Sequence, residues 1–299
     1  MEFEEDAFAT SEMFVTYSPE ITSENIYALT HFDLTKHQYH GGSTLSSGAL
    51  PKWDLLDNSY MIKRCSIDEY GNQLVDAVNE ELIHHFCNEL GVSSAYYRVV
   101  SIKYKDYETG LTKESQAVLT RIFDGLVRYR DIRQRLSLGH RADAYLEFSE
   151  KFNVQPELND LLFIDFITNQ NDRHSKNFGL VGNQMSPIYD SGSCFFVNAL
   201  DAELSEPYYD RIPNHKTFGR RLDEQLEFAL KHVHFGFSFE FDEYIIYNKF
   251  QSALERVSSY YDTTRLEFLK TFVKRRLAHV GRLLVEAQKH RDSTRQTGD

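Results

Sequence analysis

Three polar residues in the middle of the chain have the order and spacing of a phosphoryl-transfer site. Asp172 is followed five positions later by Asn177, and Asp190 stands directly before Ser191 and Gly192. In such a site the first Asp takes the proton of an acceptor hydroxyl, whereas the Asn and the second Asp hold Mg²⁺ on the phosphates of ATP. The spacing therefore predicts transfer of a phosphoryl group from Mg-ATP to a hydroxyl group.

The segment between Asn177 and Asp190 predicts a hairpin that brings these two side chains together. Residues 178–189 form two apolar stretches around a polar turn. The turn is centred between Asn183 and Gln184, at equal distance from Asn177 and Asp190, so antiparallel pairing would place those two residues opposite each other. The amide and carboxylate oxygens would then converge, as a Mg²⁺ site requires.

The residues before the hairpin predict a buried helix followed by a loop. Apolar residues recur through 158–168, which places Asp172 in a loop between two rigid elements. We expect Asp165, inside this helix, to brace the loop, and His174 to be structural because proton transfer is assigned to Asp172. The alternative is that Asp172 and its neighbours are turn residues, a common use of Asp, Asn and Gly.

The N-terminal part contains the other groups that a phosphate site needs. They are a glycine- and serine-rich stretch from Gly41 to Lys52, Lys63 on a predicted strand at 58–65, and a predicted helix at 74–90 with Glu80 and Glu81 near its middle. The stretch leaves backbone N–H groups free to surround an anion, although its composition also suits a plain surface loop. A strand Lys that contacts phosphates and is held by a helix Glu completes this kind of site.

The remaining patterns predict an α+β chain with two lobes. Strands are expected at 26–34, 96–107 and 116–123, with adenine held at Ile122 and Phe123 by backbone hydrogen bonds before a hinge at Asp124-Gly125. Helical stripes at 222–233, 241–257 and 265–289 are expected to form core. We thus expect an acidic arm at 1–25, a small β-rich N-lobe at 26–124 and a larger α-helical C-lobe at 125–299.

Composition excludes several classes of protein. The net charge of −12 argues against broad nucleic-acid or anionic-membrane binding. No apolar run is long enough to span a membrane, and the acidic first residues do not resemble a signal peptide. Three widely spaced Cys fit neither a disulfide framework nor a zinc site. A cytoplasmic protein is therefore expected. The nine Lys and Arg between Arg265 and Arg295 are interpreted as a solvated helix face.

The catalytic stretch resembles that of the HipA-like Ser/Thr kinases. The resemblance is carried by the run from Asp165 to Gly179 and by Pro187-Ile-Tyr-Asp190. The Asp-Arg-His-x-x-Asn order also occurs in phosphatidylinositol kinases, but Pro-Ile-Tyr-Asp-Ser-Gly resembles the HipA family. The segment from Gly48 to Lys52, Gly-Ala-Leu-Pro-Lys, resembles that family's glycine loop, and the position of its helix Glu selects Glu80 over Glu81. The resemblance covers about residues 40–195.

The resemblance implies ATP and Mg²⁺ as cofactors and a Ser or Thr hydroxyl of a protein as acceptor, in relatives a translation factor such as an aminoacyl-tRNA synthetase. It places Gly48 and Lys52 near the phosphates, beside Lys63. HipA-like kinases autophosphorylate in the glycine loop, which here points to Ser46 or Ser47 before Ser43; a phosphate there would repel those of ATP. Small hydroxyl residues equally suit a flexible loop.

The sequence departs from the full-length HipA toxins at its N-terminus. Those toxins have an additional subdomain that helps to contact the antitoxin, whereas about forty residues precede the glycine loop here. Antitoxin binding is therefore not carried over, and we expect a shorter, stand-alone kinase whose control by a small regulatory partner, or delivery to a target cell as an effector, stays open. Two rivals remain. The first is a kinase for a small molecule or a lipid head group, of which the acidic charge disfavours only the phosphoinositides. The second is a nucleotide-binding pseudokinase or interaction module, which the filled polar positions disfavour.

Overall fold

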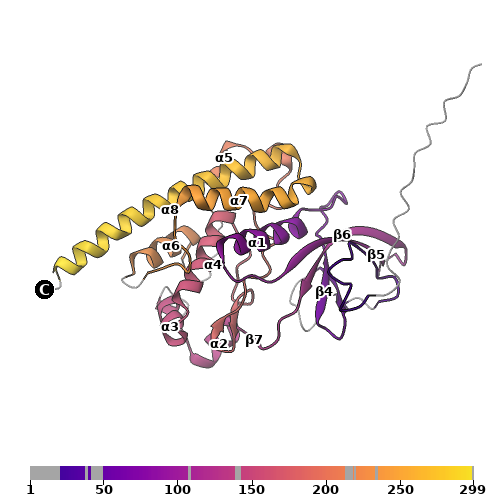
Figure 1. Cartoon of the computed structure of the whole chain (residues 1–299), viewed down its shortest axis with the longest axis horizontal. Helices are drawn as coiled ribbons and strands as arrows, with labels where there is room; N and C mark the ends of the chain where they lie inside the picture. Colours follow the sequence, from indigo (N-terminus) through magenta and orange to yellow (C-terminus); the bar gives the residue numbers. More distant parts are fainter. Residues whose placement is uncertain are drawn as a thin grey trace, which may run out of the picture.

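The computed structural model describes residues 21–37, 40–41, 50–106, 109–138, 143–212, 218, 220–232 and 235–297. Strands gather at one end of the molecule and helices at the other (Figure 1). The first part is a six-stranded sheet with one long helix, and the second is mainly helical with a small three-stranded sheet. The predicted α+β architecture, with a β-rich N-lobe and a helical C-lobe, is confirmed.

The large sheet has the strand order β1-β5-β6-β4-β3-β2. The strands are β1 (His31–Asp33), β2 (His40–Gly41), β3 (Pro51–Leu55), β4 (Tyr60–Arg64), β5 (Tyr97–Lys105) and β6 (Thr112–Arg121). All neighbours are antiparallel except β1 and β5. Successive side chains alternate between the two faces. On β5, therefore, Val99 joins the main core with α1, whereas Val100 joins a smaller cluster with Trp53 on the other face.

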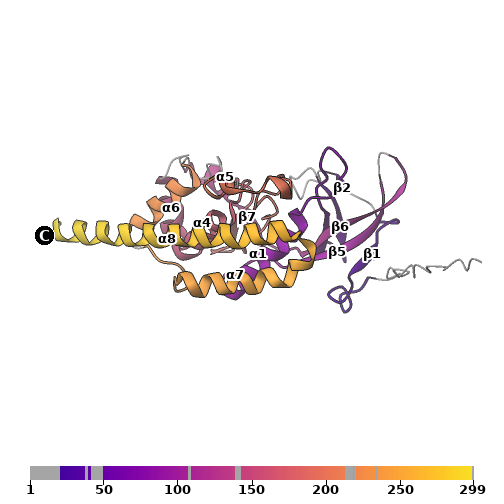
Figure 2. The same ribbon diagram turned by 90° about the horizontal axis from the view of Figure 1, so that it is seen from above.

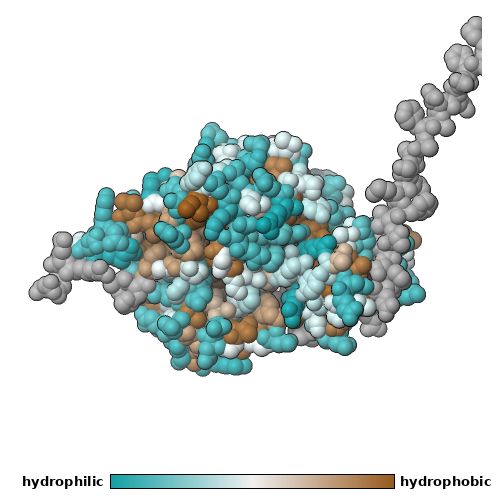
Figure 3. Space-filling model, in the orientation of Figure 1, coloured by the Kyte–Doolittle hydropathy of each residue, from teal (hydrophilic) through white to brown (hydrophobic). Residues whose placement is uncertain are grey.

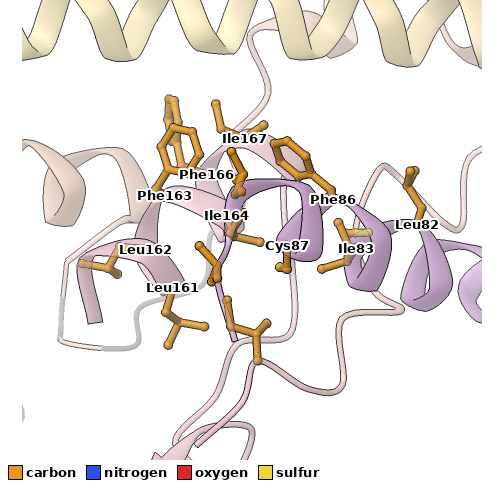
Figure 4. Packing of buried hydrophobic residues seen from close by; sticks show 14 of the residues in the cluster. Leu82, Ile83, Phe86, Cys87, Leu161, Leu162, Phe163, Ile164, Phe166 and Ile167 are labelled. Carbon is orange, nitrogen blue, oxygen red and sulfur yellow. The ribbon is translucent and has the colours of Figure 1, made fainter. Parts of the chain in front are cut away.

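Helix α1 (Asp76–Leu90) crosses the sheet and connects the two parts of the molecule. It ends at Gly91, whose left-handed backbone (φ +79°) terminates the helix. Its apolar side packs against helix α4 (Gln155–Thr168), with Phe86 and Cys87 near Ile164 and Ile167 (Figure 4). The most extensive helix contact of α1 is with α7 (Glu243–Val257), and the core that these helices share gives the site elements a rigid base.

The helical part surrounds α4, in which every residue from 158 to 168 is buried. Its other elements are β7 (Leu126–Arg128), α2 (Tyr129–Leu136), α3 (Asp143–Phe152), β8 (Gly179–Val181), β9 (Gln184–Met185), η1 (Asp201–Glu203), α5 (Glu206–Tyr209), α6 (Leu222–Lys231), α7 (Glu243–Val257), η2 (Ser258–Tyr260) and α8 (Thr263–Thr297). Helix α8 runs along the molecule beside α7, and its end projects beyond the other helices (Figure 2).

The surface is mixed in character. On the face shown in Figure 3, apolar residues are interspersed among hydrophilic ones. Within the described part of the chain, no helix combines the length and the apolar character that crossing a membrane would require.

The first strand and the start of the helical region differ from what the sequence predicted. The first strand is limited to His31–Asp33, because the chain before it turns and the Ile26 N–H donates to the Thr22 carbonyl oxygen at 3.0 Å. Strand β7 was expected to be part of the helical region, but it pairs with β8. Residues 126–128 are too few to give a strand pattern in the sequence, and they form a strand only because the fold brings them beside β8.

The predicted register of the hairpin is wrong. The observed pairs are Leu180 with Met185 and Val181 with Gln184, so the turn is formed by residues 182–183. Strand β9 then ends, because the chain leaves the hairpin and the Ile188 N–H donates to the Ser93 carbonyl oxygen at 2.9 Å. Asn177 and Asp190 are therefore not a cross-strand pair.

Candidate active site

An ion pair between the two halves of the predicted site forms its centre. Lys63 on β4 pairs with Glu80 on α1, and its Nζ also donates to Asp190 Oδ1 at 3.1 Å. The Glu80 side chain has no solvent exposure. Its neighbour Glu81 instead accepts from the Val99 N–H at 2.5 Å. The structure thus joins Lys63 to the Glu that the resemblance selected.

The three charged groups determine one another's ionisation. Burial by itself lowers the pKa of Lys63, but the carboxylates of Glu80 and Asp190 outweigh it and raise this pKa well above its ordinary value. Burial raises the pKa of Glu80 to about 7, against the opposing effect of Lys63. Burial also opposes ionisation of Asp190, but Lys63 and Lys52 keep its pKa below the ordinary value. Lys63 is therefore a stable cation and Asp190 a stable anion.

The backbone around Asp190 is held in an uncommon conformation. Asp190 has a left-handed φ of +54°. Its N–H donates to the Tyr97 hydroxyl at 2.9 Å, and its carbonyl oxygen accepts from Gln170 Nε2 at 3.3 Å. A Cβ at Gly192 would lie 3.2 Å from Glu80 Oε1, so a glycine there allows the segment to approach α1 closely. These contacts direct the Asp190 carboxylate toward Lys63.

The predicted catalytic loop connects Asn177 to Asp172. Asn177 Nδ2 donates to the Asp172 carbonyl oxygen at 2.9 Å, which leaves Oδ1 as the acceptor atom. Asn177 and Asp190 line the same cleft although they do not pair across the hairpin. The Asp172 side chain is 53% exposed and lines a neighbouring hollow. His174 Nδ1 accepts from the Lys176 N–H at 3.3 Å and its Nε2 lies 3.9 Å from Asp172 Oδ1, so its structural role stays a prediction.

One buried guanidinium group, which the sequence analysis missed, holds this loop. Arg173 contacts both carboxylate oxygens of Asp165 at 3.0 to 3.2 Å. It also donates to the carbonyl oxygens of Asn177 at 2.8 Å and Tyr189 at 2.6 Å, and to the Ser191 hydroxyl at 3.0 Å. The bracing role predicted for Asp165 is confirmed. The sequence did contain a signal for this pair, because Asp165 is the acid of an otherwise apolar helix segment and Arg173 stands in the loop that follows it.

The cleft between the lobes is cationic. Among the described residues, Asp190 is the one acid that lines it, and five Lys or Arg side chains do so: Lys52, Lys63, Arg121, Arg128 and Lys176. In a chain with net charge −12, this local excess of positive charge suits an anionic ligand. The prediction that Lys52 belongs to the glycine loop is wrong. It lies on β3 in register with Lys63, and burial followed by the charge of Lys63 lowers its pKa.

The predicted adenine position is partly altered by the structure. Ile122 and Phe123 line the cleft, and the Phe123 ring packs edge-on against the Tyr189 ring, with 5.5 Å between the ring centroids. The Ile122 N–H already donates to the Ser59 carbonyl oxygen at 3.0 Å, so adenine cannot bond to that group without breaking this contact. Gly48, Ser46, Ser47 and Ser43, the other predicted loop residues, lie outside the described residues.

The donor set around Asn177 and Asp190 suits Mg²⁺ bound together with a nucleotide. Among the described residues, no cluster of three His, Cys, Asp or Glu could hold a metal by itself. Mg²⁺ in nucleotide sites takes one or two protein oxygens and completes its shell with phosphates and water. The Asn177 amide oxygen and the Asp190 carboxylate are such donors, and the neighbouring lysines favour the phosphates.

The fold and the cleft define the class of the protein as a two-lobed, kinase-like fold. No protein-family model matches the sequence, and no curated protein matches it. Among solved structures, the chain is similar to the Helicobacter pylori proinflammatory kinase CtkA, with a TM-score of 0.59 and 17% identity. The match covers 87% of this chain and 99% of CtkA. The kinase-like fold that the sequence predicts is thereby confirmed.

A second solved structure is more distant. HipA of the Shewanella oneidensis MR-1 toxin-antitoxin system, in complex with HipB and operator DNA, aligns with a TM-score of 0.41 and 15% identity. The match covers 82% of this chain and 66% of the HipA chain. The structural neighbours thus include HipA itself, whereas the fold assignment depends on the likeness to CtkA.

Proposed function

We propose that this chain is an ATP-dependent Ser/Thr protein kinase. One observation carries the proposal: Lys63, held by Glu80 on α1, meets Asp190 in a cationic cleft that Asn177 also lines. A lone strand lysine or loop Asp is common in proteins. Their convergence from β4, α1 and the loop after β9 supplies a fixed cation, a fixed anion and an amide oxygen at one place, as nucleotide phosphates with a divalent cation require.

In this proposal the residues of the cleft share the binding of Mg-ATP. Lys63 and Lys52, side by side on β4 and β3, bind phosphate oxygens. Asn177 Oδ1 and the Asp190 carboxylate would hold Mg²⁺, which neutralises charge on the phosphates when it is bound. Adenine lies against Phe123. Its hydrogen bonds go to the Phe123 N–H and the Ile122 carbonyl oxygen, because the Ile122 N–H is already bonded within the protein.

Asp172 receives the proton of the acceptor hydroxyl. The hydroxyl oxygen forms a bond to the γ-phosphorus, the bond from that phosphorus to the bridging oxygen of ADP breaks, and the proton passes to the Asp172 carboxylate. The position of Asp172 supports this role. Its backbone N–H is held by Gln170 Oε1 at 3.0 Å, its carbonyl oxygen is bonded to Asn177, and its carboxylate remains open to solvent.

The acceptor is assigned to the hollow beside Asp172. This cavity has a volume of about 630 Å³ and is lined by Asp172 together with Phe196, Tyr208 and other residues of the segment that follows Gly192. In this proposal the hollow receives the Ser or Thr side chain of the acceptor protein; its size lies within the range of ligand pockets in general, so the choice between a protein and a small molecule rests on the experiment below. A small regulatory partner remains a prediction from the sequence resemblance, because the likeness to HipA is too distant to carry it.

The proposal is tested with the purified protein, dephosphorylated casein as acceptor, Mg²⁺ and γ-labelled ATP. We expect the wild type to transfer label to casein or to itself, with peptide mapping showing whether Ser46 or Ser47 is modified. Asp172→Asn should keep the rise in melting temperature caused by Mg-ATP but lose about 10²- to 10⁴-fold in turnover. Asp190→Ala should lose both.

Three results would count against the proposal. Turnover at the wild-type rate in Asp172→Asn would remove the role of Asp172. A thermal shift without label on any protein would favour the small-molecule kinase. Neither label nor thermal shift in the wild type would favour a module without enzymatic activity.

A further inference from the structure

The segment after Gly192 forms the outer wall of the hollow beside Asp172, and its backbone is strained. Phe195 and Phe196 have φ values of +50° and +56°. Bulky residues rarely adopt this left-handed conformation, and they keep it only where surrounding contacts determine it. Phe195 is fully buried, and Phe196 packs against Tyr208 with 5.1 Å between ring centroids. Other parts of the fold must therefore hold this wall in place.

The first such contact is made by Arg265, near the start of α8. Its residue exposure is 2%. Its Nε donates to Asp201 Oδ1 at 2.5 Å, its Nη1 to the Phe195 carbonyl oxygen at 3.2 Å and its Nη2 to the Ala199 carbonyl oxygen at 2.6 Å. One guanidinium group thus fixes both ends of the strained turn and the short helix η1 that follows it.

The second contact is made by Arg276, three turns further along the same face of α8. It is 4% exposed, and its Nη2 donates to Asn169 Oδ1 at 3.3 Å and to the Arg211 carbonyl oxygen. Its Cζ lies 4.7 Å from the ring centroid of Phe166 and 4.9 Å from that of Phe272. Its Nε is buried without a hydrogen-bond partner. Burying an incompletely satisfied cation is unfavourable, so stability alone gives no reason for an Arg here.

These two contacts correct the interpretation of the basic stretch 265–295. Arg265 and Arg276 do not belong to a solvated helix face, because both are buried and both contact the wall of the hollow. Arg275 is 47% exposed but also contacts the wall segment, with its Nη2 3.4 Å from Glu206 Oε1 and its Cζ 4.2 Å from the ring centroid of Tyr209. Arg282, further along α8, is exposed and fits the predicted solvated face.

We propose that Arg265 and Arg276 are positioning residues that hold the segment 195–212 as a preformed wall of the acceptor site, without phosphorylation of that segment. The inference rests on the proposed kinase function. In many kinases a phosphate added to this segment recruits an Arg, and the new ion pair orders it. Here the Asp201 carboxylate takes the place of such a phosphate, and the Arg comes from α8.

The first experiment measures the order of the segment without any acceptor. Wild type, Arg265→Gln, Arg276→Gln and the control Arg282→Gln, an exposed Arg of the same helix, are treated with phosphatase, shown by intact mass to carry no phosphate, and compared by hydrogen exchange with mass spectrometry. We expect the wild type and the control to protect 195–212. Arg265→Gln should lose protection mainly at 195–205 and Arg276→Gln mainly at 206–212, while α4 remains protected in all four proteins.

The second experiment measures catalysis with dephosphorylated casein as acceptor. Arg265→Gln should raise the KM for casein and lower kcat/KM about tenfold to a hundredfold, because a displaced wall misplaces the acceptor hydroxyl. The Kd for Mg-ADP should stay at the wild-type value, since the nucleotide cleft is separate. Asp201→Asn, which leaves the two carbonyl bonds of Arg265, should give the same pattern in weaker form. This variant serves as the test if Arg265→Gln fails to fold.

Two outcomes would overturn the inference. The first is unchanged protection of 195–212 in the Arg265 and Arg276 variants. The second is a wild-type segment that gains protection only after Ser205, Tyr208 or Tyr209 has been phosphorylated. If the wild type transfers no phosphoryl group to any protein, the proposed function fails instead, while the exchange data still decide whether the two arginines hold the wall.

Discussion

Replacing Arg173 by Gln should destabilise the protein more than any substitution of an exposed charge. Arg173 is 2% exposed, and its removal leaves the Asp165 carboxylate buried without its cation and two carbonyl oxygens without a donor. Breaking a buried ion pair from one side costs about 3–5 kcal/mol. This is a large part of the roughly 5–15 kcal/mol by which a domain is stable. We therefore expect a loss of about 4 kcal/mol in the free energy of unfolding.

The effect should depend on pH in a definite direction. Burial raises the pKa of Asp165, and Arg173 opposes that rise. Without Arg173 the folded-state pKa lies further above the unfolded value of about 3.9. Between these two pKa values the folded state then binds more protons than the unfolded state, so the stability of the variant falls as pH rises through this interval. The destabilisation should be smaller at about pH 5 than at about pH 8.

The assay is urea unfolding followed by circular dichroism at both pH values. The control is Arg130→Gln, because the Arg130 pair with Asp131 is exposed (38% and 37%) and should change stability by less than about 1 kcal/mol. Adding Asp165→Asn to Arg173→Gln should cost less than the sum of the single changes. A loss below about 1 kcal/mol in Arg173→Gln, or a loss equal at both pH values, would refute the reasoning.

Two further predictions concern the nucleotide cleft. Because burial lowers the pKa of Lys52, Mg-ATP binding should weaken as pH rises toward the ordinary pKa range of Lys. Lys52→Arg should move this loss of affinity to higher pH. Isothermal titration measures the affinity at each pH, and identical profiles for the two proteins would contradict the prediction. Glu80→Gln should weaken Mg-ATP binding about ten- to a hundredfold, because Lys63 loses a charged acceptor. Glu81→Gln should alter stability alone, because Glu81 bonds to the Val99 N–H instead. Equal nucleotide affinities in the two variants would contradict this difference.

Much of the architecture followed from local patterns. The apolar spacing at 74–90 and the Gly at 91 correspond to α1 and its cap, and the alternation at 96–107 corresponds to β5. The order of a loop, a strand Lys, a helix Glu and the Asp, Asn and Asp block indicated a kinase-like chain before any contact was known. These features are local because helical and strand periods repeat within one element.

Other features depend on partners far away in the sequence. The predicted hairpin was too long because Ile188 pairs with Ser94 and donates its N–H to the Ser93 carbonyl oxygen, a contact that no pattern within the hairpin shows. Lys52 was placed in the glycine loop because Gly-Ala-Leu-Pro-Lys resembles that loop in HipA-like kinases, yet pairing with β4 makes it a strand residue opposite Lys63.

The sequence by itself determined which residue types are present for phosphoryl transfer and the elements that carry most of them. Only the tertiary structure decided several of the groups that meet: Lys63 with Asp190, Arg173 with Asp165, and Arg265 with Asp201. The physical reason is that a buried charge is stable only beside a partner, and packing of α1, α4 and α8 against the rest of the chain selects that partner. A list of Lys and Arg in one helix cannot show which of them face water and which hold the wall of a site.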